Sequence, residues 1–198
     1  MTRATAAALA ALLLAGCDGP LLFAEVEVPE LRATLPSQHF PATDTTNPAD
    51  WCDPLGIGFP PCVAVTAAYD LAAQIPSLTE PGVTYELRLT DVALTLSTQA
   101  GGPSDLSGIV RATVIVGYDP AVPGSGTIVA TYVRPPSPGS PSTVAVSGNA
   151  NLDLSAYVQT GQLPVRVEVE IDNSMPAFDA DILAAFYIRV TLDWGSLI

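Results

Sequence analysis

Short runs in which apolar and polar residues alternate make up much of the chain. The clearest extends from Val165 to Ile171, where valine or isoleucine at every second position alternates with arginine or glutamate. A period of two places apolar side chains on one face of a strand and polar ones on the other, which is typical of a half-buried antiparallel strand. Further runs occupy residues 23–28, 109–116, 127–133, 143–147, 152–158 and 182–194. The pattern predicts that most of the protein is antiparallel β-sheet.

One long alternating run changes phase halfway along. Its apolar positions have odd numbers from Val83 to Leu89 and even numbers from Val92 to Leu96. A single straight strand would turn the second half of these side chains toward solvent. The break at residues 90–91 therefore predicts a β-bulge, or two strands that meet at a bend.

The N-terminal half contains two less regular segments. The run at 23–28 is followed by Pro29, which lacks a backbone N–H and therefore limits the strand to a sheet edge or ends it. Residues 63–75 are rich in alanine and predict a short helix, although residues 65–67 fit the start of a strand equally well.

The number and spacing of these runs define the expected fold class. Seven to nine short strands, separated by turns rich in Pro, Gly, Asp and Asn, predict an all-β sandwich or barrel. A long last strand, variable loop lengths and the lack of a repeat favour a single antiparallel β-sandwich of jelly-roll or immunoglobulin-like type. The proline-rich stretch 134–143 is then a protruding loop rather than a linker, because the chain has the same β character on both sides of it.

Composition excludes two broad classes. The 198 residues include 20 acidic side chains, seven arginines and no lysine, for a net charge of −13. This balance excludes a general nucleic-acid binder, whose affinity comes from clustered basic residues. With 48% hydrophobic and 14% charged residues, the chain is also unlike an intrinsically disordered protein.

The N-terminus has the features of an export signal. A short start containing Arg3 precedes an apolar core from Ala4 to Leu14, which is too short to span a bilayer as a helix of about 20 residues. The tetrad Leu14-Ala15-Gly16-Cys17 closely resembles the lipobox of bacterial lipoproteins. In that family the cysteine is diacylated on its sulfur and the signal is cut just before it.

The resemblance implies a location and a domain layout. Residues 1–16 would be a cleaved signal and Cys17 the lipid anchor, with the membrane as partner. The protein would lie on the periplasmic or extracellular side of the cell membrane or the outer membrane. Residues 17–50 would be a proline-rich tether with the edge strand, and residues 51–198 the β-sandwich domain.

Two further cysteines predict a disulfide. Cys52 and Cys62 are an even pair in a chain expected in an oxidising compartment, and the segment between them contains three prolines and two glycines. Their spacing differs from that of redox pairs, and His39 is the only histidine available to a metal site. A structural disulfide is therefore favoured, worth on the order of 3 kcal/mol in the chain-entropy model.

Candidate chemistry is sparse. The chain has no Gly-x-Ser-x-Gly motif and no phosphate-binding loop, so no catalytic residue is assigned and no cofactor is expected. Spacing alone leaves a Ser-His-Asp triad on His39 open. If the strands at 165–171 and 182–194 pair, Glu168 or Glu170 faces Arg189 as an ordinary surface ion pair.

Calcium is the one metal that the sequence suggests. Asn149, Asn151 and Asp153 place oxygen ligands at alternate positions, as the start of a calcium loop does. Asp179 and Asp181 form a second, smaller cluster. Solvent-facing turns or strand faces explain both groups equally well, so these five residues are candidates only.

These observations predict a lipid-anchored, non-catalytic β-sandwich that serves binding, adhesion or envelope structure. Its ligand, a protein or a glycan, is unknown. The loops at 41–62 and 134–143 are candidate recognition sites, because a rigid sandwich displays its loops. The alternative is an envelope hydrolase or carbohydrate-active enzyme, whose pair of carboxylates the sequence does not single out.

Overall fold

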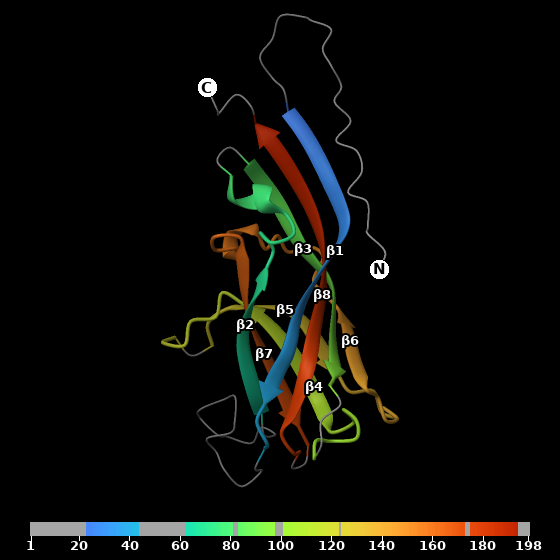
Figure 1. Cartoon of the computed structure of the whole chain (residues 1–198). Coiled ribbons are helices and arrows are strands. Elements are labelled where there is room, and N and C mark those ends of the chain that lie inside the picture. The colour runs from blue at the N-terminus through green and yellow to red at the C-terminus, as the bar shows by residue number, and fades with distance from the viewer. Residues whose placement is uncertain are drawn as a thin grey trace, which may run out of the picture.

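In the described part of the chain, eight strands form two four-stranded antiparallel sheets (Figure 1). A computed structural model describes residues 23–43, 62–80, 83–97, 101–122, 124–172 and 175–193. The strands are β1 (Phe23–Phe40), β2 (Cys62–Asp70), β3 (Val83–Leu96), β4 (Ile109–Val116), β5 (Thr127–Val133), β6 (Thr143–Ser147), β7 (Gln162–Ile171) and β8 (Phe178–Asp193). Two 3-10 turns, η2 (Pro76–Thr79) and η3 (Ser155–Tyr157), lie between them. Among the residues described, no helix has the length and apolar character to cross a bilayer.

The strand order is that of a jelly roll. One sheet has the order β1-β8-β3-β6 and the other β2-β7-β4-β5. The chain can be described as a long hairpin in which β1 pairs with β8, β2 with β7, β3 with β6 and β4 with β5. When this hairpin rolls up, β8 also pairs with β3 and β7 also pairs with β4, which produces the observed order. The predicted all-β sandwich is confirmed, and of its two variants the structure has the jelly roll.

The apolar faces of the two sheets form the core. Every second residue of β7 from Val165 to Ile171 is buried, as the alternation predicts. Opposite them, Phe186 and Ile188 of β8 are fully buried, and the ring of Tyr69 meets that of Phe186 edge-on at 5.6 Å. The core therefore consists of the side chains that period-two alternation points inward.

The phase break in β3 is a β-bulge within one continuous strand. The register of β3 against β8 shifts between Leu89 and Asp91. The Thr90 hydroxyl donates a hydrogen bond to the Ala185 carbonyl at 2.9 Å, and the Gly148 N–H donates one to the Thr90 carbonyl at 2.7 Å. A Cβ at Gly148 would lie 2.4 Å from the Leu89 carbonyl oxygen, so a glycine allows this close approach.

The first strand is longer than predicted and moves the domain boundary. β1 lies at a sheet edge, as Pro29 requires, but it continues past this residue to Phe40. Its register against β8 breaks at both prolines, Pro29 and Pro36, so neither interrupts a regular ladder. Leu31 and Leu35 are buried in the core. Residues 23–40 thus belong to the sandwich, whereas the predicted boundary at residue 51 placed them in the tether.

The predicted helix at 63–75 is wrong. Residues 62–70 form β2, in which Val63 pairs with Val169 and Val65 with Val167 of β7. Alanine favours helix only weakly, and the pairing with β7 outweighs that preference. The only helical backbone near this segment in the described part of the chain is the single turn η2, which begins at Pro76, after the predicted helix.

The predicted strand at 152–158 is also wrong. The Asp153 carboxylate accepts hydrogen bonds from the N–H groups of Leu87 and Ser155, both at 3.0 Å. An aspartate that bonds nearby backbone in this way favours a turn over a strand ladder. The turn η3 follows, and Leu154 fills the core as a buried side chain.

Candidate functional site: the distal loops

The described parts of four loops lie together at one end of the sandwich, far from the start of β1 (Figure 1). Because neighbouring strands are antiparallel, β1, β3, β5 and β7 all run toward this end. The connections that follow these strands are residues 41–61, 97–108, 134–142 and 172–177, called the distal loops here. Both candidate recognition loops predicted from the sequence, at 41–62 and 134–143, are among these four connections.

Hydrogen bonds tie the first and last distal loops together. The Thr43 N–H donates to the Met175 carbonyl at 3.0 Å, and the Met175 N–H donates to the Thr43 hydroxyl at 3.0 Å. Thr43 is only 5% exposed. This reciprocal pair holds the segment after β1 against the segment before β8.

Arg134 joins three of the four distal loops, those that follow β3, β5 and β7. Its guanidinium donates a hydrogen bond to the Ser107 carbonyl at 2.9 Å and forms an ion pair with Asp172. One arginine therefore links the loop that follows β5 to the ends of the loops that follow β3 and β7. A charge-assisted contact of this kind is stronger than a neutral hydrogen bond.

A tight turn further fixes the loop between β3 and β4. The Ser107 hydroxyl and N–H both donate to the Asp105 carboxylate, and these hydrogen bonds hold the pKa of Asp105 below its ordinary value. Ser140 of the loop after β5 contributes to the same effect. The Leu106 N–H donates to the Pro141 carbonyl at 2.8 Å. The described parts of the distal loops thus form one connected polar platform.

A histidine and two aspartates lie at the base of this platform. The His39 Nδ1 is 2.7 Å from an Asp179 carboxylate oxygen, and the Ser37 N–H donates to Asp181 at 2.8 Å. Ser37 has a left-handed backbone with φ of 49°. The two proposed calcium ligands therefore fasten the bulge of β1 to β8. No local pattern indicates the contact between His39 and Asp179, because these residues are 140 positions apart.

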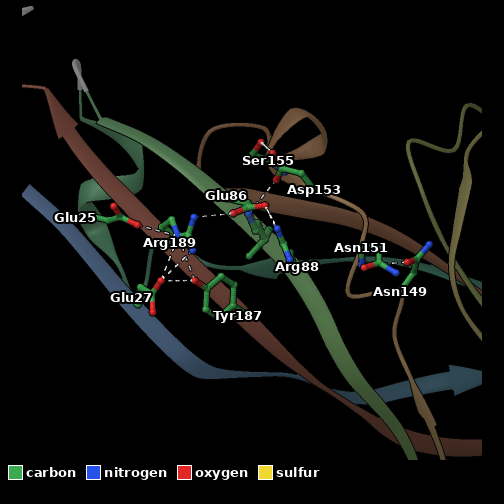
Figure 2. A network of polar contacts seen from close by, with 11 residues as sticks. Glu25, Glu27, Glu86, Arg88, Asn149, Asn151, Asp153, Ser155, Tyr187 and Arg189 are labelled. Atoms are coloured by element: carbon green, nitrogen blue, oxygen red, sulfur yellow. Dashed lines mark hydrogen bonds and ion pairs between the residues drawn. The ribbon is translucent and has the colours of Figure 1, made fainter. Parts of the chain in front are cut away.

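The other calcium candidates lie elsewhere in the fold. In Figure 2, Asn149 and Asn151 lie apart from Asp153, and an Asn149 side-chain oxygen accepts the Asn151 N–H at 3.1 Å. Burial alone would raise the pKa of Asp153, but hydrogen bonds from Leu87 and Ser155 outweigh it and hold this pKa below its ordinary value. Within the described ranges, no three His, Cys, Asp or Glu side chains gather as a metal site.

A second cluster of polar side chains lies on the outer face of the sheet that contains β1, β8 and β3, at the end where β1 begins (Figure 2). Arg189 of β8 contacts Glu25 at 3.0 Å and Glu27 at 3.1 Å of β1, and Glu86 of β3 at 4.0 Å. The Tyr187 hydroxyl donates to Glu27 at 2.8 Å. Hydrogen bonds from the phenol and the guanidinium lower the pKa of Glu27. These five residues are called the Arg189 cluster here.

The cluster corrects the expected partners of Arg189. Glu168 and Glu170 belong to β7, which lies in the opposite sheet from β8. Arg166 instead pairs with Glu168 at 2.7 Å, and Arg111 with Glu170 at 3.3 Å. The ion pairs of Arg189 with Glu25 and Glu27 are half-exposed, and such pairs contribute little to stability, so the Arg189 cluster is a surface feature rather than a structural support.

A small apolar cavity between the two sheets, within the described part of the chain, is too small for a ligand. Its volume is about 10 Å³, and its lining is apolar, including Leu89, Val116, Leu154 and Phe186. That is at the lower limit for a single water molecule, and the apolar lining supplies no polar partner. A binding site is therefore expected on the surface rather than in this cavity.

The cysteines are only partly described. Cys62 is buried at the start of β2, close to the distal loops. Cys52 and Cys17 lie outside the described residues. The disulfide and the lipid anchor therefore stay predictions.

Comparison with known proteins adds little beyond the fold. No family model matches the chain, and a search of curated proteins finds no match. The fold is similar to a structure of Desmodium yellow mottle tymovirus, with 9% sequence identity and a TM-score of 0.39 over 92% of this chain and 94% of that chain. It is also similar to a structure of turnip yellow mosaic virus, with 12% identity and a TM-score of 0.37 over 92% of this chain and 88% of that chain. A third similar structure is that of a carbohydrate-binding module of the β-sandwich superfamily, with 8% identity and a TM-score of 0.26 over 82% of this chain and 54% of that chain. Likeness this distant carries no argument about function.

Proposed function

We propose that the protein is a lipid-anchored component of a bacterial cell envelope whose β-sandwich binds a protein or glycan partner without catalysis. The anchor is supported by the tetrad that ends at Cys17. Binding through the distal loops is supported above all by the contacts of Thr43 with Met175 and of Arg134 with Ser107 and Asp172.

These contacts matter because ordering a loop on binding costs free energy. Loops that are already held in one arrangement lose less conformational freedom when a partner binds. Recognition residues are often carried on such loops, positioned by a rigid scaffold. The distal loops meet both conditions, since their described parts are tied to one another and to the ends of the two sheets.

The anchor is tested by the variant Cys17→Ala. The wild-type protein is expected in the detergent phase of a phase-separation assay and in the membrane fraction, because two or three acyl chains give durable anchoring. The variant is expected in the aqueous phase. Equal partition of the two proteins would contradict the anchor.

Binding is tested by calorimetry with the full-length protein in detergent micelles. Soluble cell-wall glycan fragments and calcium chloride are the probes, and a binder gives saturable heat without product. Ser137→Trp alters an exposed residue of the distal loops, whereas Ala121→Trp alters an exposed residue of the β4–β5 connection at the opposite end. Only Ser137→Trp should weaken binding. Equal affinity of both variants would move the site away from the distal loops.

The second candidate function is hydrolysis, for which the contact between His39 and Asp179 is the specific observation. A carboxylate at the Nδ1 of a histidine orients the ring in Ser-His-Asp triads. Within the described part of the chain, no serine hydroxyl bonds to His39. Chromatography of the same glycan probes tests this function. Product that disappears in His39→Gln would favour the enzyme.

A further inference from the structure

We infer that the protein stands on the membrane by the end at which β1 begins, so that the distal loops face away from the lipid. This inference rests on the proposed anchor at Cys17. It adds which end of the jelly roll meets the lipid surface and which end is left to a partner. Three features of the chain support it: the tether length, the direction of β1 and the pairing of its arginines.

The tether is short. Five residues separate Cys17 from Phe23, the first residue of β1. A fully extended chain advances about 3.3–3.6 Å per residue, so the two Cα atoms lie at most roughly 20 Å apart. The start of β1 is therefore close to the headgroups whatever path the tether takes.

The direction of β1 then separates the two ends. β1 pairs with β8 along its whole length, from Phe23 opposite Asp193 to Phe40 opposite Phe178. Eighteen residues in a strand extend for roughly 50–60 Å. The distal loops follow Phe40, so their distance from the start of β1 is more than twice the reach of the tether (Figure 1).

Charge decides between an upright molecule and one that lies on its side. Anionic headgroups attract clusters of unpaired Lys and Arg. The chain has no lysine and a net charge of −13. Each arginine in the described part of the chain forms an ion pair with a carboxylate; these are Arg32, Arg88, Arg111, Arg134, Arg166 and Arg189. The described faces thus offer no basic patch that would hold the sandwich flat on an anionic membrane.

The Arg189 cluster strengthens this argument because it lies near the anchored end. Glu25, Glu27 and Glu86 lie there on the outer face of the sheet with the guanidinium groups of Arg189 and Arg88, so carboxylates outnumber guanidinium groups. If the molecule tilted toward this face, the carboxylates would approach anionic headgroups and be repelled. The upright position keeps them at the edge of the lipid surface.

Energy transfer from the protein to the lipid surface tests the orientation. Full-length lipidated protein is added to preformed vesicles of phosphatidylcholine and phosphatidylglycerol that carry an acceptor dye on a fraction of the headgroups. A donor dye is attached to a cysteine introduced by Thr84→Cys, in β3 at the end where β1 begins, or by Ser137→Cys, in the distal loops. Both residues are exposed. Transfer should be several-fold greater from position 84. Equal transfer, or greater transfer from position 137, would overturn the inference.

Two controls separate failure of the orientation from failure of the anchor. A 20-residue Gly/Ser insertion after Gly19 adds a flexible span of about 25 Å and should reduce the difference between the probes. Cys17→Ala should leave the protein unbound to these vesicles, and binding by this variant would contradict the electrostatic argument. If mass spectrometry finds no acyl chains on wild-type Cys17, the proposed function itself is wrong and the inference falls with it.

Discussion

Replacing Ile188 by aspartate tests whether β8 is buried on one face as the structure describes. Ile188 lies in the middle of β8 and is fully buried. Its neighbours in the sheet are Val28 of β1 and Leu87 of β3, so no side chain opposite it offers a hydrogen bond. A carboxylate at this position would be buried without a partner.

The expected loss of stability is large. Removing the apolar side chain of Ile188 alone costs about 2–5 kcal/mol, as for other fully buried isoleucines. The new carboxyl group adds a second cost, because burial disfavours its charged form and raises its pKa above the unfolded value of about 3.9. Each unit of that shift adds about 1.4 kcal/mol at neutral pH. The sum is a major part of a typical stability of about 5–15 kcal/mol.

Urea denaturation of Ile188→Asp and Ile188→Asn at pH 4 and pH 7 measures the two costs separately. The folded aspartate variant holds its proton more tightly than the unfolded chain, so its stability falls as the pH rises above about 4. The asparagine variant has nearly the same shape and no such titration. The gap between the two midpoints should therefore widen from pH 4 to pH 7. If both variants fail to fold, Ile188→Val, expected to cost about 1 kcal/mol, still reports burial.

The matched control is Arg189→Ala, one residue along on the outer face. This change removes half-exposed ion pairs and should shift the midpoint far less than the changes at Ile188. Arg189→Asp is a poorer control, because it would place a fourth carboxylate beside Glu25, Glu27 and Glu86. The reasoning would be refuted if Ile188→Asp and Arg189→Ala had similar urea midpoints. It would also be refuted if the difference in midpoint between Ile188→Asp and Ile188→Asn were the same at pH 4 and pH 7.

Three further predictions concern stability. Replacing both Cys52 and Cys62 by alanine should lower the free energy of unfolding by up to about 3 kcal/mol, and two free thiols in non-reducing mass spectrometry of exported protein would contradict the disulfide. Gly148→Ala should cost about 1–3 kcal/mol in urea denaturation, because its Cβ would lie 2.4 Å from a backbone oxygen of β3. Gly108→Ala, whose Cβ would meet only ordinary contacts, is its control. The pKa of Asp153 is lower in the folded than in the unfolded chain, so its carboxylate stabilises the fold above about pH 4, and this contribution is lost as the pH falls further. The free energy of unfolding of Asp153→Ala should therefore decrease less than that of the wild type as the pH is lowered below about 4.

The alternating pattern was sufficient to locate most of the sheet. In a half-buried strand each side chain faces either core or solvent, so β4, β5 and β6 have the bounds that the sequence predicts. The bulge in β3 was also visible, because a phase change in the pattern is a local signal. The local pattern led to wrong secondary-structure predictions where contacts with a distant segment determined the conformation. The alanine-rich β2 became a strand by pairing with β7, and Asp153 turned an alternating stretch into a turn.

The candidate site was predictable only in its parts. The sequence marked two exposed loops, but their meeting at one end follows from the jelly-roll strand order, which no local pattern encodes. The same holds for single contacts. Thr43 and Met175 are 132 residues apart, and Glu27 and Arg189 are 162 apart. Periodicity reports the environment of each position along its own strand. Which strands become neighbours depends on how the two sheets bury their apolar faces together, and that is a property of the whole chain.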